Sequence, residues 1–163
     1  MSDAARIRAF RHALDDAIAD ELERHPWGTL VSTPSLPDVW DLNFLRVERG
    51  RRGAASLARE ADELQAHLFH RKVELDRTNE QLAQGLRDLG WSPAEHVVMA
   101  LRREPDRWVD DSMVRVVPQR ELDAVRERLN EEEYGGTAIA RHLTATKRRV
   151  SRAYWLGLLC VAS

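Results

Sequence analysis

The chain has 163 residues, of which 43% are hydrophobic and 32% are charged, and its formal net charge is −2. This composition excludes an intrinsically disordered chain, and the near-neutral charge does not point to nucleic acid or to a membrane surface. The single cysteine, Cys160, excludes an intrachain disulfide and a cysteine-based zinc cluster, as expected in a reducing cytoplasm. The N-terminus lacks the apolar run of a signal peptide, and the apolar segment 153–161 is about half as long as a membrane-spanning helix. We therefore expect a cytoplasmic protein without a membrane span.

Hydrophobic spacing in the first hundred residues predicts alternating helices and strands. Apolar side chains at three- and four-residue intervals, from Ile7 to Leu22, predict an amphipathic helix that Pro26 closes. Pro34 and Pro37 bracket a turn between two strands. In chain order we expect a helix over 4–24, strands over 27–33 and 39–47, a helix over 54–68, a strand over 70–75, a helix from Thr78 to Leu89 and a strand over 97–101.

A charged, proline-containing linker is expected over 104–112, and a second set of elements follows it. That set is a strand over 113–117, a helix from Pro118, a helix from Thr137 and a closing strand over 154–161. The first of these helices is expected to turn Leu122, Val125 and Leu129 inward. The mixture of helices and strands along the whole chain predicts a mixed α/β fold.

A glycine- and arginine-rich loop lies between the strand expected over 39–47 and the helix expected over 54–68. Such a loop offers a polyphosphate small residues, exposed backbone N–H groups, two arginines and the positive end of a helix dipole. Because arginine grips phosphate with two parallel hydrogen bonds, Arg51 and Arg52 are expected to make the strongest contacts. The alternative is a solvent-exposed turn that happens to precede a helix. The candidate phosphate-binding residues are Gly50, Arg51, Arg52, Gly53, Ala54 and Ala55.

Other residues that carry chemistry are better explained by structure. His67 and His70 are three residues apart but have no acidic or thiolate partner at a fitting spacing, so a histidine pair at a helix end is expected rather than a metal site. The carboxylates of Asp15, Asp16 and 131–133 are expected on solvated faces. The tryptophans are expected to pack in the core rather than to stack on nucleic-acid bases. We therefore expect neither a metal nor a nucleic-acid partner.

The segment from Val39 to Arg103 resembles the C-terminal half of the GNAT (Gcn5-related N-acetyltransferase) fold. In that family a central strand leads into an Arg/Gln-x-x-Gly-x-Gly/Ala loop whose N–H groups bind the acyl-CoA pyrophosphate. A helix, a strand, a helix ending near Leu-Gly-Phe and a final strand follow, and here Leu89-Gly90-Trp91 stands at the Leu-Gly-Phe position. Two stretches also look like the leading half of two-unit bacterial GNAT proteins, namely WGTLVSTPSLPDVWDLNFLRV and GWSPAEHVVMALRREPDR.

The resemblance implies a GNAT-like fold with a degenerate leading unit over 1–103 and the first part of a second unit over 113–163. The leading unit looks degenerate because the first position of the loop motif is Gly50 rather than Arg or Gln. The implied activity is acetyl transfer from acetyl-CoA to an unidentified primary amine, weak or absent in this short form. The amine would attack the thioester directly with the help of a general base. No residue is assigned as that base, and Tyr134 and Tyr154 lie outside the matching segment.

A non-catalytic interaction module derived from the same fold is the alternative. Without its partner strands, the second unit would leave a sheet edge with unpaired N–H and C=O groups, which favours a homo-oligomer or another protein partner. The two hypotheses differ at Gly53. A phosphate loop needs a small residue there so that the backbone can approach the ligand, whereas an interaction module would tolerate glutamate.

Overall fold

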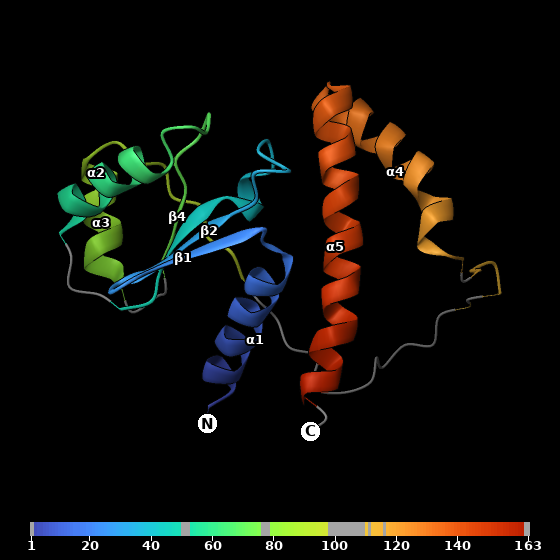
Figure 1. Ribbon diagram of the computed structural model, residues 1–163, viewed down its shortest axis with the longest axis horizontal. Coiled ribbons are helices and arrows are strands. Elements are labelled where there is room, and N and C mark those ends of the chain that lie inside the picture. The colour runs from blue at the N-terminus through green and yellow to red at the C-terminus, as the bar shows by residue number, and fades with distance from the viewer. Residues whose placement is uncertain are drawn as a thin grey trace.

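The computed structural model describes residues 2–49, 53–75, 79–97, 110, 112–115 and 117–161, with side chains up to residue 153. Within these ranges the chain forms a mixed α/β fold with one four-stranded sheet and five α-helices (Figure 1). The elements are α1 (Asp3–Ile18), β1 (Glu21–His25), β2 (Gly28–Ser32), a 3-10 turn (Trp40–Leu42), β3 (Phe44–Val47), α2 (Ala54–Leu64), β4 (Val73–Glu74), α3 (Glu80–Asp88), α4 (Gln119–Tyr134) and α5 (Thr137–Val161).

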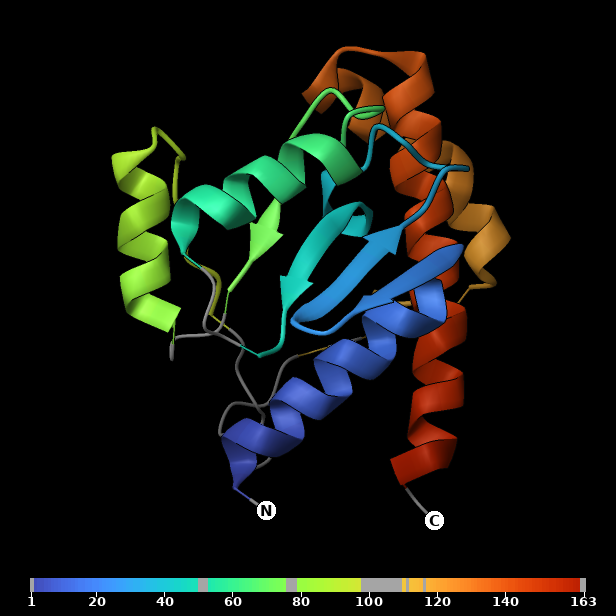
Figure 2. The same cartoon turned by 60° about the vertical axis from the view of Figure 1, so that its left-hand side comes forward.

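The sheet has the strand order β1-β2-β3-β4. β1, β2 and β3 are antiparallel neighbours, and Pro26 and Trp27 form the two-residue turn between β1 and β2. β4 pairs in parallel with β3 through two residues of each strand. Parallel neighbours need a crossover connection, and α2 supplies it. Figure 2 shows this β3–α2–β4 unit, with α2 lying across the sheet.

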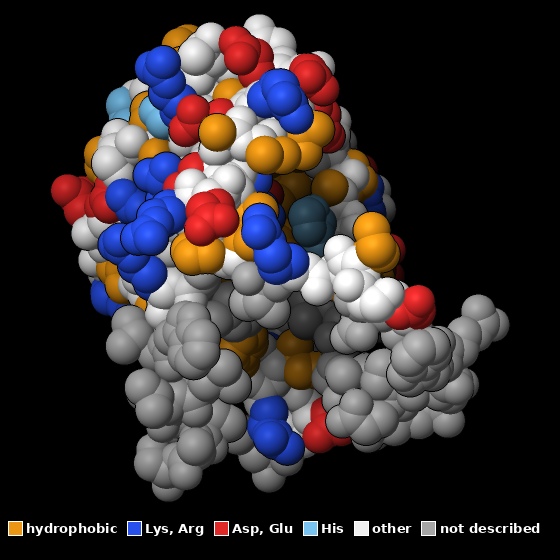
Figure 3. Space-filling model, turned by 90° about the vertical axis from the view of Figure 1, so that its right-hand side faces the viewer, with side chains coloured by type: hydrophobic (Ala, Val, Ile, Leu, Met, Phe, Trp, Pro, Cys, Tyr) orange, Lys and Arg blue, Asp and Glu red, His pale blue; other side chains and the backbone are white. Residues whose placement is uncertain are grey.

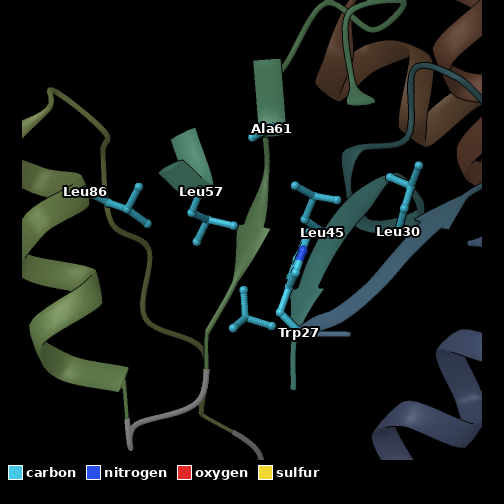
Figure 4. Packing of buried hydrophobic residues seen from close by; sticks show 7 residues of the cluster. Trp27, Leu30, Leu45, Leu57, Ala61 and Leu86 are labelled. Carbon is cyan, nitrogen blue, oxygen red and sulfur yellow. The ribbon is translucent and has the colours of Figure 1, made fainter. Parts of the chain in front are cut away.

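One face of the sheet packs against α2 and α3. Leu45 and Val47 alternate with Arg46 along β3, so they point to this face while Arg46 points to the other. On this face a cluster of buried hydrophobic side chains joins Leu45 and Val47 to Leu57 of α2 and Leu86 of α3 (Figure 4). Burying one such side chain contributes about 1.5–3 kcal/mol, so the cluster fixes α2 on the sheet. Its buried members are Trp27, Leu30, Leu45, Val47, Leu57, Ala61 and Leu86.

α5 packs against α1 and against the segment between β2 and β3. Ile18 at the end of α1 and Ala153 of α5 belong to the same buried cluster. α4 joins α5 through a short turn in which Gly135 has a φ of 73°. Glycine adopts this left-handed conformation most readily, which explains why α4 ends there. The first and the last helix therefore share a core, as their side-by-side positions in Figure 1 illustrate.

Most predicted elements of the chain are confirmed. The helices expected over 54–68 and from Thr78 to Leu89 are α2 and α3, and those expected from Pro118 and Thr137 are α4 and α5. The strands expected over 27–33 and 70–75 are β2 and β4. Gly90 has a φ of 89°, as expected of the residue that follows a helix.

The helix expected over 4–24 ends earlier, at Ile18, and residues 21–25 form β1 instead. Leu22 keeps a helical spacing from Ile18, so the periodicity continues into the strand. The two-residue turn after His25 overrides that periodicity, because it brings Leu22 opposite Val31 in the hairpin. Long-range strand pairing, rather than local preference, sets this boundary.

The strand expected over 39–47 starts only at Phe44. Residues 40–42 form a single 3-10 turn, and the side chain of Asn43 holds the turn in place. Its amide donates hydrogen bonds to the carbonyl oxygens of Leu36 and Val39, each at 3.0 Å. Asparagine favours such side-chain-to-backbone bonds over a regular strand.

The strands expected in the last third of the chain are wrong where the structure describes them. Residues 154–161 continue α5 to Val161, because a short apolar run is compatible with a buried helix as well as a strand. Residues 113–115 and 117 lie in no strand, nor does Val97, while 98–101 lies outside the described residues. The unit boundary at 104–112 stays a prediction.

Although α5 is 25 residues long, no helix in the described part of the chain is long and apolar enough to cross a membrane.

Candidate functional site

The N-terminus of α2 is the structural counterpart of the predicted phosphate loop. Gly50, Arg51 and Arg52 lie outside the described residues. Gly53 is the N-cap of α2, with an extended backbone of φ −71° and ψ 148°, and Ala54 and Ala55 begin the helix. The structure therefore brings three of the six predicted residues to a helix N-terminus.

This helix end has the features that an anion requires. The Gly53 carbonyl accepts the N–H groups of Ser56 and Leu57, each at 3.1 Å, which closes the first turn. The N-cap residue Gly53 supplies no side-chain cap, and the first turn of α2 contains no acidic residue. A Cβ atom added to Gly53 would meet nothing within 4 Å among the described residues, so a small side chain would fit at this position. Backbone N–H groups and the positive end of the helix dipole are the features of this helix end that favour an anion.

Ala54 has a structural role beside its place in the loop. Its side chain packs against the cluster between the sheet and α2. An ideal Cβ atom at Gly85 of α3 would lie 2.7 Å from the Ala54 Cβ atom, so the two helices touch there. Ala54 therefore orients the first turn of α2 against α3, and only its backbone N–H is free to serve a ligand.

A surface depression of about 560 Å³ lies at the opposite end of α2. It is bordered by Glu63, Leu64 and His67 near the end of that helix and by Glu21 and Glu23 of β1. The carboxylates around it oppose the binding of an anion, and the length of α2 separates it from Gly53. The depression is therefore not part of the phosphate site.

A layer of charged side chains lies on the other face of the sheet, beneath α1. The strand registers place Arg24, Thr29, Arg46 and Glu74 in one row across β1, β2, β3 and β4. The Arg24 guanidinium donates to the Thr29 hydroxyl at 2.9 Å, and that hydroxyl donates to Glu48 at 2.8 Å. Polar groups that leave water need partners of this kind.

Arg46 is the centre of this layer, and its side chain is only 4% exposed. Its guanidinium lies 2.8 Å from Asp16, 3.0 Å from Glu48 and 3.6 Å from Asp15. Burial alone would raise the pKa of Asp16, but hydrogen bonds from Arg46 and Arg24 outweigh it and hold that pKa below its ordinary value. The layer is a mutually neutralising ion cluster that anchors α1 to the sheet.

The expectation that Asp15 and Asp16 lie on a solvated face is wrong. Asp15 is only 4% exposed, and both carboxylates turn toward Arg46. The sequence carries one signal for this arrangement: Arg46 interrupts the apolar run of a buried strand, and a cation there requires acidic partners. The signal does not say which acids they are, because α1 is far from β3 in sequence.

The variant Asp15→Asn is expected to gain stability relative to wild type as the pH rises. Burial raises the pKa of the Asp15 carboxyl from 3.8 to about 6. The folded state therefore holds the proton more tightly, and this contribution to stability is lost as the pH rises through about 6. Asparagine does not titrate, so the wild type should lose on the order of 2 kcal/mol relative to the variant between about pH 4 and 7. Urea denaturation across this range measures the difference, and a difference independent of pH would contradict it.

The two histidines that the sequence singles out lie in different environments. His67 is exposed, whereas His70 is buried beyond the end of α2. The Nε2 atom of His70 lies 2.9 Å from the Asn43 carbonyl oxygen, and Trp40 stacks on its ring. Burial lowers the pKa of His70, which favours a neutral ring that fixes the start of β3. Among the described residues, no group of three or more His, Cys, Asp or Glu side chains is arranged to hold a metal ion.

A comparison of the chain with protein-family models, with curated proteins and with solved structures finds no match. The function must therefore be argued from the helix terminus and from the order of the elements around it.

Proposed function

We propose that this chain is a GNAT-like protein whose leading unit, residues 1–103, binds the pyrophosphate of acetyl-CoA at the segment 50–55. Its family chemistry would be acetyl transfer from acetyl-CoA to a primary amine. The observation that carries the proposal is the N-terminus of α2 in the connection after β3, where the N-cap residue Gly53 supplies no side-chain cap. Arg51 and Arg52 would add the charges that fix the phosphates.

The order of elements supports the proposal. β3, α2, β4 and α3 follow one another as the resemblance predicts, and β4 is parallel to β3. The Leu-Gly-Trp turn comes directly after α3, where the Trp91 N–H donates to the Leu86 carbonyl at 3.0 Å. Trp91 also packs against the cluster that holds α2. The segment that would form the final strand lies largely outside the described residues.

The proposed binding of the cofactor pyrophosphate requires few side-chain contacts. The pyrophosphate needs N–H donors and cations, which residues 50–55 supply. The amine would attack the thioester carbonyl while backbone N–H groups stabilise the oxyanion and a base removes the amine proton. The C–S bond would then break, and CoA would leave as the thiolate. No described residue near α2 is assigned as that base, so the proposal rests on cofactor binding.

Calorimetric titration with acetyl-CoA tests the proposal. Wild type is expected to bind with micromolar affinity, and Arg51→Ala/Arg52→Ala should weaken binding by tenfold or more, because roughly 1.5–3 kcal/mol is lost with each charged hydrogen bond. Gly53→Glu should abolish binding, since it places a carboxylate where the phosphates lie. The fold should tolerate that change, because a side chain at Gly53 meets open space.

The matched control is Arg120→Ala/Arg141→Ala, which removes the same charge from exposed positions on α4 and α5. It should bind acetyl-CoA like wild type. Absence of binding at millimolar acetyl-CoA, or an equal loss in the control, would contradict a phosphate site at α2.

Pairing through a sheet edge, the alternative function, has less support. The last predicted strand belongs to α5, so it leaves no open edge there. The outer strand β1 carries Glu21, Glu23 and Arg24, and charged residues on an edge strand oppose edge-to-edge pairing.

A further inference from the structure

α4 packs with its polar side against α5. Asp123 of α4 is buried, and the Arg148 side chain of α5 donates to it at 2.9 Å. Asn130 donates to the Thr144 hydroxyl of α5 at 3.2 Å. Hydrogen bonds and an ion pair therefore hold this hairpin together, where an apolar seam is the usual solution.

The apolar stripe of α4 points away from α5 instead. Leu122, Val125 and Leu129 recur at three- and four-residue intervals, so they share one side of the helix. Val125 is 44% and Leu129 is 53% exposed, so the expectation that they face inward is wrong, whereas Leu122 is half-buried. Figure 3 shows the side of the molecule on which α4 and α5 lie, with hydrophobic side chains among charged ones.

The charges beside this stripe are arranged symmetrically about Val125. Glu121 precedes Leu122 and Arg128 precedes Leu129, so an acid and a base lie on the same flank two helical turns apart. Within the described part of the chain, the Arg128 guanidinium makes a long contact of 4.0 Å with Glu132 of its own helix, and both side chains are largely exposed. Both Glu121 and Arg128 can therefore reach a partner across the stripe.

We propose that two copies of this chain pair through α4, with the two helices antiparallel about a two-fold axis near Val125. In that arrangement Leu122 of each copy meets Leu129 of the other, and Val125 meets its own counterpart. Glu121 of each copy faces Arg128 of the other, because a two-fold axis exchanges the two ends of the helix. The self-complementary charges select a second copy as the partner. The inference is independent of acyl-CoA binding.

Sedimentation equilibrium without acetyl-CoA tests the proposal. Wild type should show a reversible monomer–dimer equilibrium, and Leu129→Glu should be monomeric because it places a carboxylate in the apolar seam. Glu121→Arg alone and Arg128→Glu alone should each weaken the dimer by about tenfold, since every dimer contains the pair twice. The double variant Glu121→Arg/Arg128→Glu should restore wild-type affinity, because it only exchanges the two signs.

Phe69→Glu is the matched control, because Phe69 is 97% exposed and lies outside α4. It should dimerise like wild type, and circular dichroism should show wild-type helix content in every variant. A wild type that is monomeric at all concentrations would overturn the proposal. So would a dimer that survives Leu129→Glu, or a double variant that dimerises no better than the single ones.

Discussion

Replacing Arg46 with methionine is expected to lower the free energy of unfolding by about 3–5 kcal/mol at neutral pH. Arg46 is the buried cation that faces Asp15, Asp16 and Glu48. Without it, the buried Asp15 and the partly buried Asp16 and Glu48 lose the cation that they share, and an uncompensated buried charge is strongly unfavourable. Chemical denaturation followed by circular dichroism measures the loss.

The matched control is Arg24→Met in the same layer. The Arg24 side chain also pairs with Asp16, at 2.7 Å, but it is 57% exposed. An exposed ion pair contributes about 1 kcal/mol or less, so this variant should remain close to wild type. Similar losses in the two variants would contradict the central position of Arg46.

Gly28→Ala is expected to have an effect of comparable size, about 3 kcal/mol or more. A Cβ atom at Gly28 would lie 2.0 Å from the carbonyl oxygen of Arg46 and 3.2 Å from the Cα atom of Val47. These are backbone atoms of the neighbouring strand, so they cannot move aside without breaking the β2–β3 pairing. The midpoint of urea unfolding should fall accordingly.

Gly53→Ala is the control for this substitution, because it adds the same methyl group at a position with open space and a φ of −71°. It should cost about 1 kcal/mol or less, the usual difference between glycine and alanine at a helix N-cap. If both alanine variants unfold at the same urea concentration, the close approach at Gly28 is not a constraint on the fold.

Local patterns in the sequence predict the helices well. The apolar stripe of α3 predicts that helix, and Gly90 and Gly135 follow the ends of α3 and α4. These signals can be read from the sequence because they act over only a few residues. Strand boundaries depend on distant partners. Leu22 continues the helical spacing of α1, and only its pairing with Val31 places it in a strand.

The buried charged layer around Arg46 likewise depends on contacts between residues that are distant in the sequence. The sequence shows a cation in an apolar strand at Arg46, but its partners Asp15 and Asp16 come from a helix thirty residues earlier. Spacing along the chain contains no information on such a contact. The direction of the α4 stripe was missed for a related reason, because the polar pairs of Asp123 and Asn130 with α5 outweigh the burial of Val125 and Leu129.

The candidate phosphate site, in contrast, depends on residues that are close together in the sequence. The local motif predicts a helix that begins at Ala54, and the structure confirms that start, with Gly53 as the N-cap. What the pattern does not contain is a residue for acid–base chemistry. The candidate cofactor site is consequently better defined than any catalytic step.

The most direct measurement is a nuclear magnetic resonance titration of the labelled protein with acetyl-CoA. If acyl-CoA pyrophosphate binds at α2, the backbone amide signals of Ala54, Ala55 and Ser56 should shift with increasing ligand, while those of Ala140 and Thr144 in α5 remain in place. The same shifts should disappear in Arg51→Ala/Arg52→Ala. Unchanged α2 signals at millimolar acetyl-CoA, or shifts confined to another surface, would contradict the proposed function.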